Sequence, residues 1–111
     1  MQTYTFIVLT NPSEGSEEEY NRWYEEQHIP DLLKVPGVIG AQRFRMAHDP
    51  MQANPLWRYL VIYELQTEDP KEVMDEVLRR VGGETMPMSE ALDPHLFAVV
   101  YEPVSVGGGA P

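Results

Sequence analysis

Apolar and polar residues follow two different periods along this chain, and each period predicts a type of secondary structure. Alternation with a period of two is typical of strands. Residues 3–10 are apolar or β-branched at nearly every position, which favours a central strand covered on both faces. Further strands are predicted at residues 38–48, 57–67 and 96–104.

Two segments instead repeat with the helical period. The first helix is expected to begin at Ser16, and Pro30 disfavours helical geometry at Ile29, so a bend or break is expected there. A further turn at residues 31–34 would end at Pro36-Gly37. One face of this helix carries Tyr20, Trp23, Tyr24, Gln27 and His28.

The second helix has signals at both ends. Asp69 is suited to the N-cap and Pro70 to the first helical position, and Gly82-Gly83 follows the last turn. Its buried stripe is predicted to be Val73, Met74, Val77, Leu78 and Val81.

The element order is therefore β-α-β-β-α-β. This order predicts an α+β, ferredoxin-like fold, in which a four-stranded antiparallel sheet carries both helices on one face. The other sheet face also carries apolar residues, and an uncovered apolar face of this kind marks an interface. We expect two copies to pack face to face as a homodimer with a closed, barrel-like core.

Length, charge and composition limit the domain organisation and the classes of function that the chain can have. The 111 residues predict a single domain over 1–106 with a flexible, Gly-rich tail at 107–111. The net charge of -10 argues against nucleic acids and anionic lipid surfaces as partners. The absence of cysteine excludes disulfides, thiolate nucleophiles and zinc-thiolate sites. No segment is typical of a signal peptide or a membrane span, so a cytoplasmic protein is expected.

Residues 20–33 read Tyr-Asn-Arg-Trp-Tyr-Glu-Glu-Gln-His-Ile-Pro-Asp-Leu-Leu, and Val35-Pro36-Gly37-Val38 follow. This stretch resembles the first-helix signature of EthD-like proteins in the dimeric α+β barrel superfamily. The resemblance implies a dimer with a small pocket in each subunit, between the sheet and its helices. It also implies, in several enzymatic branches, a helix His or a pocket Tyr as acid or base. Only His28, Tyr24 and Trp23 can be carried over by position.

His28 is the foremost catalytic candidate, because an imidazole can take and return a proton near neutral pH without a cofactor. Asp31 follows three residues later and is placed to orient that imidazole. The alternatives remain open: His28 as a structural residue that caps helix-end carbonyls or bonds Asp31, and Asp31 as a solvated surface acid.

Aromatic residues are the candidates for binding a substrate. Tyr20, Trp23 and Tyr24 either line an aromatic pocket or simply pack in the core. Tyr59 and Tyr63 share one strand face, and either supply a hydroxyl to a substrate or pack in the dimer core with their hydroxyls at its rim.

Arg43, which shares a strand face with Arg45, is a further candidate. A buried arginine can clamp a substrate carboxylate through two parallel hydrogen bonds. The alternatives are an ion pair with an acid on a neighbouring strand, such as Glu64 or Glu102, and a position at the surface.

No metal or cofactor is expected. His28, His48 and His95 lack the spacing of a helical metal site, and haem ligation by His28 is a minor alternative. The sequence thus favours a cofactor-independent enzyme that acts by proton transfer on a small apolar or aromatic molecule, polyketide- or lactone-like. An isomerase, cyclase, dehydratase or decarboxylase would fit. The alternatives are a non-catalytic small-molecule-binding or accessory protein of a catabolic pathway, and a monooxygenase.

Overall fold

A computed structural model describes residues 2–52 and 57–108. Part of the predicted tail at 107–111 lies outside these residues, as do residues 53–56 between the second and third predicted strands. The elements are β1 (Gln2–Thr10), α1 (Glu17–Trp23), η1 (Tyr24–His28), α2 (Ile29–Leu33), β2 (Val38–Arg45), β3 (Tyr59–Thr67), α3 (Pro70–Arg80) and β4 (Phe97–Tyr101).

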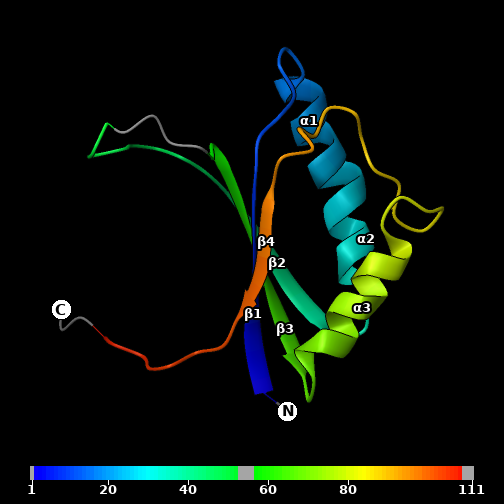
Figure 1. Ribbon diagram of the computed structural model, residues 1–111, viewed down its shortest axis with the longest axis vertical. Helices are drawn as coiled ribbons and strands as arrows, with labels where there is room; N and C mark the ends of the chain where they lie inside the picture. Colours follow the sequence, from blue (N-terminus) through cyan, green and yellow to red (C-terminus); the bar gives the residue numbers. More distant parts are fainter. Residues whose placement is uncertain (1, 53–56, 109–111) are drawn as a thin grey trace.

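The four strands form one antiparallel sheet in the order β2-β3-β1-β4, and the helices cover one face of it (Figure 1). The predicted ferredoxin-like α+β fold is confirmed. In the register, Phe6 of β1 lies opposite Tyr63 of β3 and Val100 of β4, and all three side chains face the helices. The chain after β2 and the segment 102–108 both leave the sheet toward the other side (Figure 1).

Three strands are shorter than predicted. The alternation that suggested strands at 38–48, 57–67 and 96–104 extends into segments without ladder partners, so β2, β3 and β4 occupy only part of each range. α3 begins as predicted, because the Asp69 carboxylate accepts a hydrogen bond from the Lys71 N–H at 2.9 Å. Leu78 and Val81 are wrong as members of its buried stripe, since these side chains are 72 and 41 % exposed.

The predicted loss of helical geometry at Ile29 is wrong, because this residue has a φ of -62° and a ψ of -47°; the irregularity before Pro30 is a π turn. Helix α1 continues through a π-helical turn, η1, into α2, and the N–H of Ile29 donates to the carbonyl of Tyr24, five residues earlier. A proline ring inside a regular helix clashes with the carbonyl four residues before it and leaves that carbonyl without its donor. The wider π turn adds one residue ahead of Pro30, which lets the helix continue.

Gly37 explains part of the Pro-Gly motif in structural terms. Its φ of +96° favours glycine, and a Cβ there would lie 2.7 Å from Val73 Cγ2 of α3. The start of β2 thereby approaches α3 closely, and the long helix α1–η1–α2 is fixed beside it.

Candidate functional site

The residues predicted to form the site lie on the helix-covered side of the molecule. Tyr20 and Tyr24 point from α1 and η1 toward the sheet, and Tyr63 points from β3 toward the helices. The three side chains are at most 1 % exposed. Arg43 reaches the same region from β2, so four of the seven predicted residues meet between helix and sheet.

The Arg43 guanidinium lies among three tyrosine rings. Its Cζ is 5.6 Å from the ring centroid of Tyr20, 4.7 Å from that of Tyr24 and 5.5 Å from that of Tyr59. Nη2 donates to Asn21 Oδ1 at 2.7 Å, and Nη1 lies 3.4 Å from Glu25 Oε1. The aromatic rings and two helix residues therefore hold this cation.

The predicted pairing of Arg43 with Glu64 or Glu102 is wrong. Arg43 lies opposite Val61 in the ladder, whereas Glu64 lies opposite Gly40 and belongs to the other alternation of β3, which faces away from the helices. Glu102 follows β4, which is separated from β2 by two strands.

Hydroxyl groups occupy the end of the cluster near Thr10. Thr10 Oγ1 lies 2.6 Å from Tyr20 Oη and 3.3 Å from Tyr24 Oη. Tyr59 Oη donates to Glu17 and accepts from Asn21 Nδ2 at 3.3 Å. The interpretation that Tyr59 or Tyr63 packs in a dimer core is wrong for both, because both face this chain's own helices.

Sequence reasoning missed Thr10 and Asn21 as partners in this network. Thr10 continues the buried alternation of β1, so a hydroxyl at a position that otherwise takes apolar residues was the available signal. Asn21 is one of several polar residues on α1, and nothing in its spacing distinguishes it from the solvated ones.

Three buried polar atoms in the described part of the chain have no hydrogen-bond partner: His28 Nδ1, Arg43 Nε and Tyr63 Oη. Buried polar groups are nearly always satisfied, and an exception calls for an explanation such as a ligand. Burial raises the pKa of Tyr20 to about 12 and raises the pKa of Tyr24 and of Tyr63 as well. The tyrosines therefore stay protonated and can donate.

His28 stacks on Trp23, with ring centroids 4.4 Å apart, and meets the edge of Tyr24 at 5.4 Å. Burial lowers its pKa to about 4, and the charge of Asp31 opposes this shift in part. The imidazole is therefore neutral at pH 7. The rings of Trp23 and Tyr24 fix its position from two sides.

The predicted role of Asp31 in orienting His28 is not seen as a hydrogen bond to Nδ1, which has no partner. The Asp31 carboxylate is buried and instead accepts from Gln27 Nε2 at 2.6 Å. Asp31 thus acts on the imidazole through its charge. The reading of Asp31 as a solvated surface acid is wrong, because its side chain is 5 % exposed.

Trp23 ties the helix to the segment that precedes β4, because its Nε1 donates to the Pro87 carbonyl at 3.2 Å. Together with Gln27 and Met88 it also lines an open cavity of about 490 Å³ between the helix and residues 87–90. Trp23 therefore touches His28 on one side and an open cavity on the other.

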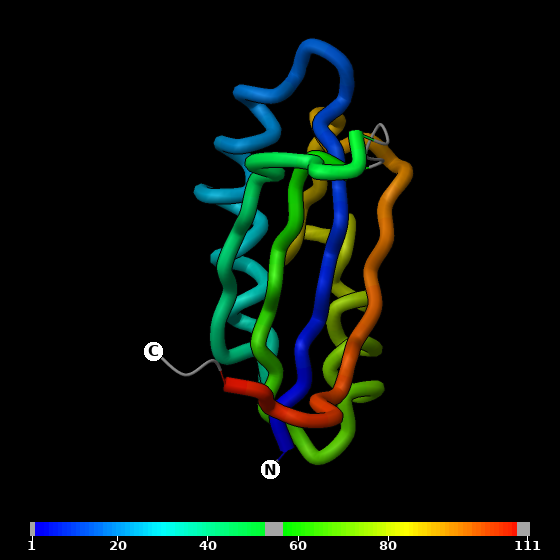
Figure 2. Tube along the Cα trace, turned by 90° about the vertical axis from the view of Figure 1, so that its left-hand side faces the viewer, coloured from blue at the N-terminus to red at the C-terminus, as the bar shows by residue number. Residues whose placement is uncertain are grey.

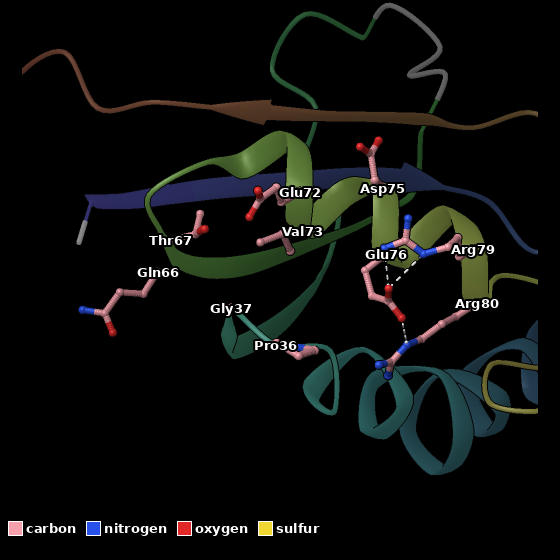
Figure 3. A pocket seen from close by; sticks show the side chains of 10 residues that line it. All are labelled: Pro36, Gly37, Gln66, Thr67, Glu72, Val73, Asp75, Glu76, Arg79 and Arg80. Carbon is pink, nitrogen blue, oxygen red and sulfur yellow. Dashed lines mark hydrogen bonds and ion pairs between the residues drawn. The ribbon is translucent and has the colours of Figure 1, made fainter.

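The largest of the five cavities described lies elsewhere. It is open to solvent, measures about 680 Å³ and is lined by α3, Pro36-Gly37 and the end of β3 (Figure 3). Three of its charged groups pair with one another: Glu76 accepts from Arg79 Nη2 at 2.6 Å and from Arg80 Nε at 2.7 Å (Figure 3). None of the five cavities described for residues 2–52 and 57–108, which range from 230 to 680 Å³, is lined by His28, Arg43 or Tyr63.

Metal-ligating side chains do not gather in the part of the chain that the structure describes. Among the described residues there is no group of three or more His, Asp or Glu side chains placed to hold a metal ion. His48 is exposed, and His95 stacks on Trp57 with centroids 5.2 Å apart. No helix in the described ranges has the length and apolar character needed to cross a bilayer.

Three solved structures share this fold. A candidate monooxygenase from Shewanella loihica PV-4 is 14% identical with a TM-score of 0.65, and the match covers 95% of this chain and 97% of that one. An ethyl tert-butyl ether d (EthD) family protein from Bacillus halodurans C-125 is 14% identical with a TM-score of 0.55, and the match covers 94% and 100%. A hypothetical Arabidopsis thaliana protein is 13% identical with a TM-score of 0.64, and the match covers 96% and 93%.

These likenesses confirm, at the level of the fold, the resemblance to EthD-like proteins. The model of one protein family, described as a domain of unknown function (DUF4286), matches residues 3–81. No curated protein matches the chain.

Proposed function

We propose that this chain, which belongs to the DUF4286 family, binds a small apolar molecule and transfers a proton on it without a cofactor. The molecule is aromatic or lactone-like and lies between the long helix and the sheet. These must separate to admit it, because none of the five described cavities is lined by His28, Arg43 or Tyr63. One observation carries the proposal: three buried polar atoms without partners, His28 Nδ1, Arg43 Nε and Tyr63 Oη, adjoin one aromatic cluster. A ligand with both aromatic surface and an oxygen would satisfy that cluster.

The reaction begins at a carbon–hydrogen bond next to a carbonyl group. The neutral His28 imidazole takes the proton, and the electron pair of that bond shifts so that negative charge forms on the carbonyl oxygen. The imidazolium then returns the proton at another atom of the same molecule. Isomerisation, cyclisation and dehydration all use such a step, and decarboxylation ends with the proton return.

The experiment follows exchange of carbon-bound hydrogen for deuterium by NMR in heavy water, with 2-tetralone and a butenolide as probes. The wild-type chain should accelerate exchange, and His28→Gln should lower the protein-dependent rate by about a hundredfold or more. His48→Gln is the matched control, since His48 is exposed and lies outside the cluster. If folded His28→Gln exchanges as fast as wild type, His28 has no part in the chemistry.

A second candidate function is non-catalytic binding of the same kind of molecule, as in an accessory protein of a catabolic pathway. The low pKa of His28 favours it, because a base is most effective when its pKa lies near the working pH. Binding of the probes without accelerated exchange would support this second function. The third candidate, a monooxygenase, has support only from the fold shared with the Shewanella loihica protein.

The proposed partner, in a cytoplasmic setting, is a second copy of the chain bound through the uncovered face of the sheet. This face is turned to the viewer in Figure 2, where the segment 102–108 crosses its lower end. Phe44, Phe97 and Tyr101 are 40, 39 and 50 % exposed there. An exposed apolar patch of this kind is typical of an interface. Its apolar members are Ile7, Leu9, Phe44, Leu60, Ile62, Phe97, Val99 and Tyr101.

A further inference from the structure

We propose that Arg43 Nε and Tyr63 Oη together form a buried two-donor site for an anionic oxygen. The ligand class is therefore a molecule whose oxygen carries or gains negative charge, such as a phenolate or an enolate. This inference rests on the proposed function, because it names the oxygen on which charge forms when His28 removes a proton.

The ladder places Arg43 and Tyr63 on neighbouring strands and on the same face of the sheet. Arg43 lies opposite Val61 in the β2–β3 pair, and Tyr63 is two residues further along β3 on the same face. Side chains in this diagonal relation are within reach of each other when they are long. Tyr63 is held from the other side, because its ring stacks on Phe6 with centroids 5.6 Å apart.

Tyr63 is the free hydroxyl of the cluster. Tyr20 and Tyr24 share Thr10 Oγ1, and Tyr59 contacts Glu17 and Asn21, so these three hydroxyls have partners. Tyr63 Oη has none, although its residue is 1 % exposed. Burial keeps this phenol protonated, because it raises the pKa of Tyr63. It can therefore donate to an acceptor.

The positive charge of Arg43 is offset only weakly by the acids among the described residues. Its ion pair joins Nη1 to a Glu25 carboxylate that is 63 % exposed, at the long distance of 3.4 Å. The Arg43 side chain itself is 13 % exposed, and its Nε has no acceptor. A buried cation with a spare donor favours an anion, and two donors at low dielectric are the arrangement that stabilises an oxyanion.

The test uses the full chain and 4-nitrophenol, an aromatic probe whose phenol and phenolate forms differ in absorbance. Wild type should bind the phenolate about tenfold more tightly than the phenol, which lowers the pKa of the bound probe by about one unit. Tyr63→Phe and Arg43→Met should each remove most of this preference. Tyr4→Phe and Arg45→Met are matched controls on the same sheet face and should retain it.

A variant's fold is checked by circular dichroism, and if Arg43→Met does not fold, Tyr63→Phe decides alone. His28→Gln should bind the phenolate as wild type does, even where it abolishes exchange. The site is overturned if wild type binds both forms equally or binds neither, or if Tyr63→Phe keeps the preference. In those cases the exchange experiment still tests His28 independently.

Discussion

The two faces of the sheet differ although the same strands build both. Along β3, the residues that face the helices are Tyr59, Val61, Tyr63 and Leu65, and all four are buried. Their neighbours Leu60, Ile62, Glu64 and Gln66 face the other way, and none is buried. The covered face mixes tyrosine and arginine with aliphatic residues, whereas the uncovered face offers mainly apolar surface. The comparison teaches that polar groups able to do chemistry lie where this chain itself excludes water.

The largest expected effect on stability comes from comparing two substitutions on β3, one on each face of the sheet. Leu65→Ala should lower the free energy of unfolding by roughly 2 to 5 kcal/mol, because it leaves a cavity in the core. Leu60→Ala should cost about 1 kcal/mol or less in dilute protein, where that face meets water. Urea unfolding at low and high protein concentration measures both.

The same pair tests the proposed dimer. If two copies cover the uncovered face, the cost of Leu60→Ala should rise with protein concentration, and that of Leu65→Ala should not. Sedimentation of wild type should then give twice the 12.7 kDa chain mass. A 12.7 kDa species at micromolar concentration would contradict the dimer.

The second prediction concerns pH and belongs to the covered face. Unfolding returns the pKa of His28 from about 4 to about 6.5, so the unfolded chain binds the extra proton between these values. Stability should therefore fall as pH is lowered from about 6.5 to about 4, with a contribution of roughly 3 kcal/mol from His28.

Urea unfolding at pH 7, 6 and 5 measures how the free energy of unfolding changes with pH. The His28→Phe variant should lose this pH slope, because it has no imidazole at position 28. His48→Gln should leave the slope unchanged, because His48 is exposed in the folded chain. An identical slope in wild type and His28→Phe would show that His28 is not desolvated by folding.

The smallest effect compares two tyrosines on opposite faces. Tyr63→Phe removes a buried hydroxyl without a partner, so it should stabilise the chain by about 1 kcal/mol. Tyr101 lies on the uncovered face, so Tyr101→Phe should change stability by less than about 0.5 kcal/mol. Thermal unfolding measures both, and a destabilised Tyr63→Phe would mean that the hydroxyl has a partner in solution.

The element order and the covered face were predictable because they depend on period alone. Tyr59, Val61, Tyr63 and Leu65 share an alternation, and β3 turns that whole set toward the helices. The strand ends were less predictable, because a ladder ends where its partner ends. Whether the helix continues through Pro30 depends on the one added residue of the π turn η1, and the pattern of apolar residues does not indicate that residue.

For the candidate site, the sequence could predict which helix residues share a face but not their partners. Helical spacing put Tyr20, Tyr24 and His28 on one face, and the structure packs Tyr20 and Tyr24 in the core, with His28 against the edge of Tyr24. The partner of Arg43 was not predictable, because Asn21 and Glu25 come near it only when helix and sheet pack. The missing partner of Tyr63 is likewise a property of packing.

The π turn at residues 24–28 also bears on how relatives are aligned with this chain. Each residue of a regular helix advances about 100° around the axis. The one added residue therefore shifts the side chains after the π turn around the axis relative to those before it, and the two sets follow different helical frames. Tyr20 and Trp23 belong to the first frame, and Ile29–Leu33 to the second. A relative without the π turn should align with a one-residue gap between Tyr24 and His28. A histidine aligned there without that gap would occupy a different side of the helix.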